Sequence, residues 1–249
     1  MRDELPSPPS GATAFPRTRL SLLERVRAPS ADVRRQAFDD LVTGYWKPAY
    51  KYLRIRWRLA PEDAEDVAQG FFAVAFEKDY LATFDPAKGR FRTFLRVCLD
   101  RYANKVYRAE RARKRGGGVR RLSLDFTGAE GELRALDPPD PRELDQFFRQ
   151  ELIRDLFMRA LADVRASLLA EGKEVPFRVF ERYDLGPNEG RTYAAVAAEF
   201  GIPMTQVTNY LAAVRRRFRE RALAHLRALS GTDEEFRADA RDLFGVEVR

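Results

Sequence analysis

Apolar residues recur every three or four positions along most of this chain, which is the period of an α-helix. Two such stripes are Phe38, Leu41, Val42, Tyr45 and Trp46, and Phe91, Phe94, Leu95, Cys98, Tyr102 and Val106. No stretch alternates apolar and polar side chains as a half-buried strand does, and no fixed repeat recurs. The pattern therefore predicts an all-α fold.

Capping residues, prolines and glycines mark where these helices should begin and end. Ser30 suits the N-cap of a helix from about Ala31, and Pro48 should kink or break that helix before residues 49–59 resume it. Pro61 suits the first turn of the next helix, where acidic side chains favour the positive end of the helix dipole. After a loop at 84–89, a helix over about 90–113 should end at three glycines.

The second half of the chain predicts further helices. Asp140-Pro141-Arg142-Glu143 is a favourable helix start, and this helix should continue to about Ala170 and stop at Gly172. A turn at 186–190 precedes two short helices on either side of Gly201.

These boundaries predict two helical domains joined by a flexible acidic linker. We expect a disordered tail over 1–30, a first domain over 31–117, a linker over 118–140, a second domain over 141–229 and a C-terminal extension over 230–249. The extension is either a short amphipathic helix docked on the protein or a partner, or a frayed tail. Because the linker and the extension are acidic, a further hypothesis is that they compete in cis with DNA for basic surfaces.

Charge favours an anionic partner such as nucleic acid. The net charge is +7, and residues 88–121 hold 13 basic and two acidic side chains. A lone Cys98 and a lone His225 argue against a disulfide, a zinc cluster or histidine-based catalysis. We therefore expect no metal, no cofactor and no enzymatic activity. No apolar run is long enough for a membrane span, so we expect no membrane insertion and a cytoplasmic location.

Residues 191–223 carry the pattern of a helix-turn-helix. Small residues fill a first helix, Gly201-Ile202-Pro203 makes a tight turn, and a second helix follows. That second helix should present four side chains that can read base edges: Thr205, Gln206, Thr208 and Asn209. Arginines further along it suit phosphate contacts, and they are Arg215, Arg216, Arg217 and Arg219.

Two other helices carry candidate binding surfaces. The face of the 91–118 segment opposite its apolar stripe interleaves cations with an amide and an aromatic ring, which suits single-stranded DNA; its residues are Arg96, Asn104, Tyr107, Arg108 and Arg111. The 63–76 segment joins acids to aromatic residues expected to be exposed, Phe72 and Phe76, and is a candidate partner surface.

In this order and spacing, the three segments resemble an RNA polymerase sigma factor of the minimal, extracytoplasmic-function (ECF) type, which has only regions 2 and 4. The resemblance rests on the DAED-x-x-Q run at 63–69, the FR-x-FL run at 91–95, the acidic linker and the C-terminal helix-turn-helix, and it covers about 38–118 and 141–229. It implies a factor that binds core RNA polymerase and directs promoter-specific transcription initiation.

The resemblance also implies roles for residues. The acidic helix of region 2 would bind the clamp helices of the polymerase β′ subunit through Asp63, Glu65, Asp66 and Gln69. The basic helix would melt the −10 element and capture an unpaired base through Arg101, Asn104, Lys105, Arg108 and Arg111. Region 4 would pack on the β flap and read the −35 element through Gln206, Thr208 and Asn209, with Arg215, Arg216 and Arg219 on phosphates. Gly70 departs from the family pattern, which has an acid there.

Three further hypotheses accompany this one. A stand-alone helix-turn-helix regulator would explain 191–223 but gives the helices of 62–115 no role. A divalent-metal nuclease would use the carboxylates of 62–79. An anti-sigma protein or other regulator bound to region 4 is a partner compatible with the resemblance.

Overall fold

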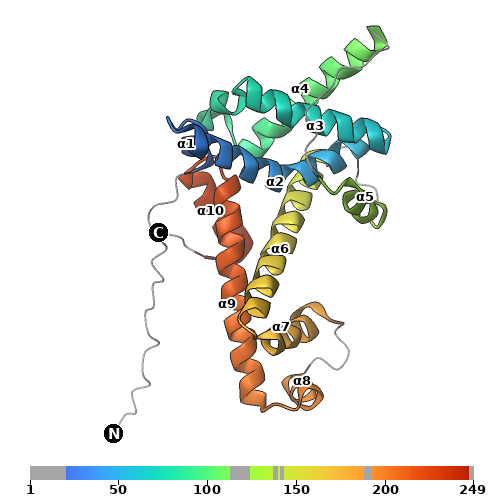
Figure 1. Ribbon diagram of the computed structural model, residues 1–249. Coiled ribbons are helices and arrows are strands. Elements are labelled where there is room, and N and C mark those ends of the chain that lie inside the picture. The colour runs from blue at the N-terminus through green and yellow to red at the C-terminus, as the bar shows by residue number, and fades with distance from the viewer. Residues whose placement is uncertain (1–20, 113–123, 137–139, 141–142, 188–191, 247–249) are drawn as a thin grey trace.

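The computed structural model describes residues 21–112, 124–136, 140, 143–187 and 192–246. Every regular element in these ranges is a helix, which confirms the all-α prediction (Figure 1). The elements are α1 (Leu22–Val26), α2 (Ala31–Arg56), α3 (Pro61–Glu77), η1 (Tyr80–Thr83), η2 (Pro86–Lys88), α4 (Phe91–Ala112), α5 (Phe126–Arg134), α6 (Leu144–Ala170), α7 (Glu174–Phe180), η3 (Glu181–Leu185), α8 (Tyr193–Phe200), α9 (Met204–Leu229) and α10 (Asp233–Phe244). Within the described ranges, no helix has both the length and the apolar character needed to cross a membrane.

Helix α2 is the centre of the first helical body, and it is longer than the sequence predicted. Pro48 was expected to kink or break it, yet α2 runs without interruption from Ala31 to Arg56. Pro48 is buried in the middle of this helix, and its neighbours Tyr45, Ala49 and Tyr52 are each 0–1% exposed. Packing on both sides of the proline thus holds the two halves in one helix, despite the hydrogen bond that proline cannot donate.

Helices α3 and α4 cover α2 and complete this body. Ala64, Ala68 and Phe71 of α3 and Leu95 and Leu99 of α4 are each 0–1% exposed and belong to one core with α2. The loop between α3 and α4 folds into the short turns η1 and η2. In Figure 1, the C-terminal part of α4 projects beyond the rest of the body.

Two segments expected to be disordered or flexible hold short helices that pack on α2. Within the predicted tail, Ser21 caps α1 in a capping box with Glu24, and Leu22 is fully buried. Within the predicted linker, Asp125 caps α5, and Phe126 packs edge-on against Trp46 and Tyr50. Residues 124–136 of the predicted flexible linker are therefore folded, because capping and aromatic packing stabilise a helix there.

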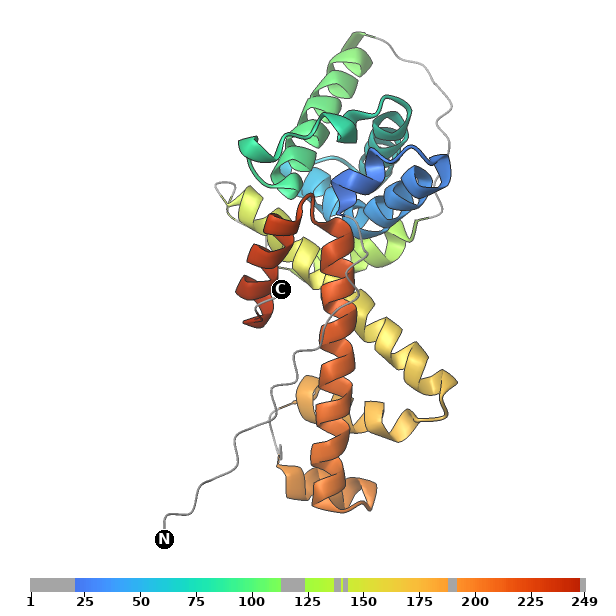
Figure 2. The same ribbon diagram turned by 90° about the vertical axis from the view of Figure 1, so that its left-hand side faces the viewer.

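Helices α6 and α9 lie side by side and connect the two ends of the molecule (Figures 1 and 2). The start of α6 packs in the first body through Phe148 and Leu152, its middle packs on α9 through Leu156 and Ala160, and its end reaches the helix-turn-helix. The predicted boundary at 140/141 is thus not a break in packing. At about 1.5 Å per residue, α6 is about 40 Å long, which sets the distance between the two ends.

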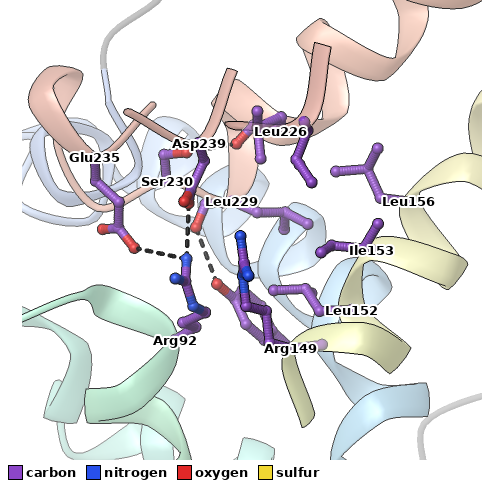
Figure 3. A pocket seen from close by; sticks show the side chains of 12 residues that line it. Arg92, Arg149, Leu152, Ile153, Leu156, Leu226, Leu229, Ser230, Glu235 and Asp239 are labelled. Carbon is purple, nitrogen blue, oxygen red and sulfur yellow. Dashed lines mark hydrogen bonds and ion pairs between the residues drawn. The ribbon is translucent and has the colours of Figure 1, made fainter. Parts of the chain in front are cut away.

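The C-terminal extension forms a docked helix rather than a frayed tail. Thr232 caps α10, and Phe236 and Ala240 pack into a core with α6 and α9. On the other side, the Asp239 carboxylate accepts from Arg92 at 2.7 Å and from Arg90, and Glu235 accepts from the backbone N–H of Phe91 at 3.1 Å. Figure 3 shows Arg92 between the two carboxylates, beside a small pocket of about 20 Å³, space for about one water molecule. Helix α10 thus joins α4 to the α6–α9 pair.

Candidate nucleic-acid interface

The expected helix-turn-helix is formed by α8, the turn at 201–203 and the start of α9. The Thr192 hydroxyl accepts from the N–H of Ala195 and caps α8. Gly201 ends α8 with φ of +62°, in the left-handed region that glycine adopts without strain. Val196 of α8 and Val207 of α9 are fully buried, which fixes the two helices against each other. Helix α9 is not short as expected but continues to Leu229.

The first turns of α9 expose the four polar side chains that the sequence singled out. They are Thr205, Gln206, Thr208 and Asn209. Gln206 Nε2 lies 2.6 Å from the Tyr210 hydroxyl, and the Thr208 hydroxyl lies 3.3 Å from the Met204 carbonyl. These local contacts leave both side chains on the outer surface, where amides and hydroxyls can donate to and accept from base edges.

The four arginines of α9 that were predicted to bind phosphates divide into two pairs. Arg215 donates to both oxygens of Asp184 at 2.7 and 2.8 Å, and these hydrogen bonds raise its pKa further above its usual value. Arg217 donates to both oxygens of Glu171 at 2.6 and 2.9 Å. Arg216 and Arg219 are exposed and have no ion-pair partner among the described residues. Arg216 and Arg219 can therefore bind a phosphate without breaking an internal bidentate contact.

At the other end of the molecule, the polar residues of α4 face in different directions. Arg101, Asn104, Lys105, Tyr107 and Arg108 are exposed. Arg111 lies in α4, but its side chain is outside the described residues. At 100° per residue, Asn104 and Arg108 point outward, Arg101 and Lys105 lie toward α3, and Tyr107 lies toward the end of α2.

Arg96 differs from the other predicted DNA-binding residues of α4, because internal partners occupy it. Its guanidinium donates to Asp145 at 2.8 Å, to Asp100 at 3.2 Å and to the Tyr52 hydroxyl at 3.3 Å. Asp145 belongs to the first turn of α6. Arg96 thus joins α4 to α6, and it is a structural residue in this fold.

A groove of about 540 Å³ lies between α4, the end of α3 and η1. Its wall includes Phe94, Cys98, Tyr102 and Val106 of α4 and Val74 of α3. Three cations line it with them, and they are Lys78, Arg101 and Lys105. Burial raises the pKa of the Cys98 thiol. An apolar groove with cations beside it has the chemistry to hold an aromatic base and its phosphate.

Most side chains of the acidic face of α3 are exposed or partly exposed, as expected, but one aromatic residue is not. Asp63 and Asp66 are exposed, and Glu65 and Gln69 are partly exposed. Burial, together with the charges of Glu62 and Asp66, raises the pKa of Glu65. Of the two aromatic residues expected on this face, Phe76 is 42% exposed but Phe72 is fully buried. Phe72 is buried because it packs edge-on against Phe71 in the core.

The packing of α3 on α4 explains why Gly70 stands between the acids and the aromatic residues. A Cβ atom at this position would lie 2.4 Å from the Tyr102 hydroxyl oxygen. Position 70 is buried and faces α4, so an acidic side chain there would displace Tyr102. The glycine at position 70 therefore has a packing cause.

Described acids of α5 and α10 form ion pairs with cations of the first helical body. Glu130 and Glu132 of α5 pair with Arg54, Lys47 and Lys51 of α2. Glu235 and Asp239 of α10 pair with Arg90 and Arg92. Within the described residues, these four acids of α5 and α10 thus form no ion pair with the exposed cations of α4 and α9 that were predicted to bind DNA.

Sequence reasoning missed one group of residues beside α4. Arg56, Trp57 and Arg58 form the turn between α2 and α3, and the Trp57 ring lies 6.4 Å from that of Tyr107. The signal in the sequence is a tryptophan flanked by arginines where the apolar period of α2 ends.

Comparison of the chain with models of protein families, with curated proteins and with solved structures finds no match. Within the described ranges, no three His, Cys, Asp or Glu side chains gather as ligands of a metal ion.

Proposed function

We propose that this protein is an initiation factor that binds a core RNA polymerase and directs it to promoters, in the manner of an ECF-type sigma factor. In this proposal, α4 and its groove bind the opened −10 element, and the start of α9 reads the −35 element. The acidic face of α3 binds the β′ clamp helices, and the helix-turn-helix end packs on the β flap. The chain has no catalytic role of its own, since the polymerase performs the chemistry.

The observation that carries the proposal is the presence of two different surfaces suited to DNA at opposite ends of the α6–α9 pair (Figure 1). One end exposes hydroxyls and amides on the first turns of a helix, which suits duplex DNA read in the major groove. The other exposes cations, an amide and an aromatic ring on α4, and a separate apolar groove lies between α4 and α3; both features suit unpaired bases. A stand-alone helix-turn-helix regulator needs only the first surface.

Each surface also has a chemical reason for its partner. The duplex surface has two exposed arginines, Arg216 and Arg219, about two and three helical turns beyond Asn209, where they can reach the phosphate backbone. The single-strand surface would bind bases only after the duplex opens. Opening costs a few kcal/mol per unstacked base, which stacking and hydrogen bonds must offset.

The experiment is binding to purified bacterial core RNA polymerase by the wild type and by a Glu65→Arg/Asp66→Arg variant. A Glu234→Arg/Asp242→Arg variant makes the same change of charge on α10 and is the matched control. We expect tight binding by the wild type and the control, and loss of binding by the α3 variant. The holoenzyme would then be used to select promoter fragments from genomic DNA.

Two other outcomes would count against the proposal. If all three proteins fail to bind the polymerase while duplex DNA is still bound, the stand-alone regulator becomes the better account. If the α3 variant binds the polymerase as tightly as the wild type, the assignment of the acidic face is wrong.

A further inference from the structure

Trp57, at the end of α2, has an indole ring whose position is fixed by α4. Its Nε1–H donates to Asp100 Oδ1 at 3.0 Å. The other Asp100 oxygen accepts from the Tyr52 hydroxyl at 2.9 Å and from Arg96 at 3.2 Å. Because Asp100 is itself held by two donors, the indole edge has a defined orientation rather than rotating freely.

Trp57 is partly buried where it packs against the first core, and it is less buried than the other tryptophan of the chain. Trp46 is 9% exposed and packs edge-on against Phe126, whereas Trp57 is only partly buried. Beside Trp57 lies Tyr107, which is 45% exposed, with the ring planes at 50° to each other. The two rings thus form a tilted aromatic pair at the surface end of α4.

Arginines of the α2–α3 turn lie beside this pair of rings. The Arg56 guanidinium lies 5.8 Å from the centre of the Trp57 ring, and the side chains of Arg56 and Arg58 are exposed. Arg58 has φ of +51°, a left-handed backbone that non-glycine residues adopt only under strain. The turn is held by Arg54, which donates to the Leu59 carbonyl and to both oxygens of Glu130.

We propose that Arg56, Trp57 and Arg58, together with Tyr107, form a stacking site for an unpaired base of single-stranded DNA, which we name the Trp57 site. The base stacks on the Trp57 ring in place of the exposed Arg56 side chain. Arg56 and Arg58 then bind the phosphates on either side of the base. The strand continues across α4 past Asn104 and Arg108. This inference rests on the proposed function and adds a second element, the α2–α3 turn, to its single-strand surface.

The two tryptophans allow a direct test by fluorescence. In a Trp46→Phe variant, Trp57 is the only tryptophan, and a stacked base should quench its emission. We expect quenching when a short single-stranded DNA oligonucleotide of mixed sequence is added at low salt, and none with the matching duplex. A Trp57→Phe variant retains only the buried Trp46 and should show no response.

Affinity measurements with the same oligonucleotide provide the second readout. Trp57→Ala should lower the affinity for single-stranded DNA about tenfold or more, and Trp57→Phe should lower it less. Arg56→Gln/Arg58→Gln should lower the affinity and flatten its dependence on salt. An Arg35→Gln/Arg241→Gln variant removes the same charge from exposed positions elsewhere and should have a smaller effect.

The outcomes separate this inference from the proposed function. Unchanged Trp57 emission on binding, or an Arg56/Arg58 effect no larger than that of the control pair, overturns the Trp57 site. If Asn104→Ala/Arg108→Gln weakens binding in that case, the proposed role of α4 still stands. If the free chain does not bind single-stranded DNA at all, the inference also fails, while polymerase and duplex binding are tested independently.

Discussion

The Lys51 ammonium group and the Glu151 carboxylate lie 2.6 Å apart, with side chains 1% and 3% exposed. Lys51 belongs to α2 and Glu151 to α6, so this ion pair joins the first helical body to the helix that leads to the helix-turn-helix. Each partner has a second contact, because Lys51 also reaches Glu132 at 2.8 Å and Glu151 reaches Arg154 at 3.0 Å. Buried charges are tolerated only when they are paired in this way. The pair therefore specifies how α6 sits on α2.

Removing one member of this pair should strongly destabilise the protein. We expect Lys51→Met or Glu151→Gln to lower the free energy of unfolding by about 3–5 kcal/mol, since each substitution leaves the other charged side chain buried without its main ion-pair partner. Lys88→Met is the control, because the Lys88–Asp85 pair is 83% and 46% exposed and should contribute little. Urea unfolding followed by circular dichroism measures all three. Equal effects of the buried and exposed substitutions would contradict the role of the pair.

Two glycines in helices should respond in opposite ways to alanine. At Gly44 of α2, a Cβ atom would lie 2.3 Å from a methyl carbon of Leu229, which is 3% exposed and cannot move away freely. Gly44→Ala should therefore cost about 1–3 kcal/mol of stability. At Gly131 of α5, no atom lies within 4 Å of the added Cβ, and Gly131→Ala should be neutral or stabilise by up to about 1 kcal/mol. Thermal unfolding distinguishes the two, and a stabilising Gly44→Ala would show that α9 does not approach α2 so closely.

Acid should weaken the attachment of α5 to α2. Hydrogen bonds from Arg54, and then from Tyr50, lower the pKa of Glu130 from an ordinary value of 4.5 to about 2. The stabilisation that ionised Glu130 contributes through these hydrogen bonds is fully present above pH 4.5, where Glu130 is also ionised in the unfolded chain. It is lost as the pH falls toward 2. Glu130→Gln should reduce stability at neutral pH by about 1–2 kcal/mol and flatten its pH dependence in that interval. Glu234→Gln, at an 81% exposed position, should leave the acid profile unchanged.

His225 should make stability depend on pH near neutrality. Burial and the charge of Arg159 lower its pKa below the ordinary 6.5, although Asp163 at 2.8 Å opposes this. The folded state then binds the proton less readily than the unfolded chain, so stability falls as the pH falls through about 6.5. His225→Gln should remove this dependence, and the chain has no other histidine that could cause it. A free energy of unfolding that rises as the pH falls toward 5.5 in the wild type would show that Asp163 raises the pKa of His225 more than burial and Arg159 lower it.

The arginines of α9 should separate into DNA-binding and structural residues. Arg216→Gln/Arg219→Gln should weaken duplex binding and reduce the slope of log affinity against log salt by about 2, roughly 0.9 for each lost phosphate contact. Arg217→Gln removes one positive charge from the same helix but breaks the Glu171 pair, so it should act mainly on stability. Fluorescence anisotropy at several salt concentrations tests this. Equal salt slopes for all variants would mean that none of these side chains touches phosphate.

The helices themselves could largely be predicted from local sequence. Caps such as Ser30 and Thr192 and the terminating residues Gly172 and Gly201 act on their nearest neighbours along the chain, so their effect can be recognised without a fold. The exposed amides and hydroxyls at the start of α9 follow from the same helical period. The predicted break at Pro48 failed because the packing that keeps α2 continuous comes from distant helices.

Two sequence patterns could have shown that the supposed linker contains the helix α5 and that α6 packs against several neighbours. Asp125, Phe126, Ala129 and Leu133 combine a cap with apolar residues at helical spacing inside the supposed linker. The buried residues of α6 include acids as well as aromatic and aliphatic side chains, which is typical of a helix with neighbours on several sides. Neither pattern identifies the neighbouring helix.

The sequence by itself determined the helical class, the position of the helix-turn-helix and the placement of basic and acidic residues on particular helices. Only the tertiary structure decided which of those residues remain available to a partner. Arg96 and Arg108 are equivalent by local pattern. In the fold, however, Arg96 pairs with Asp145, which is 49 residues away in the sequence, whereas Arg108 stays exposed. Likewise Trp57 meets Tyr107 and Asp100 only because α2 ends beside α4. Helical period depends on neighbours along the chain, whereas the partner of a charge or a ring depends on which helix packs beside it.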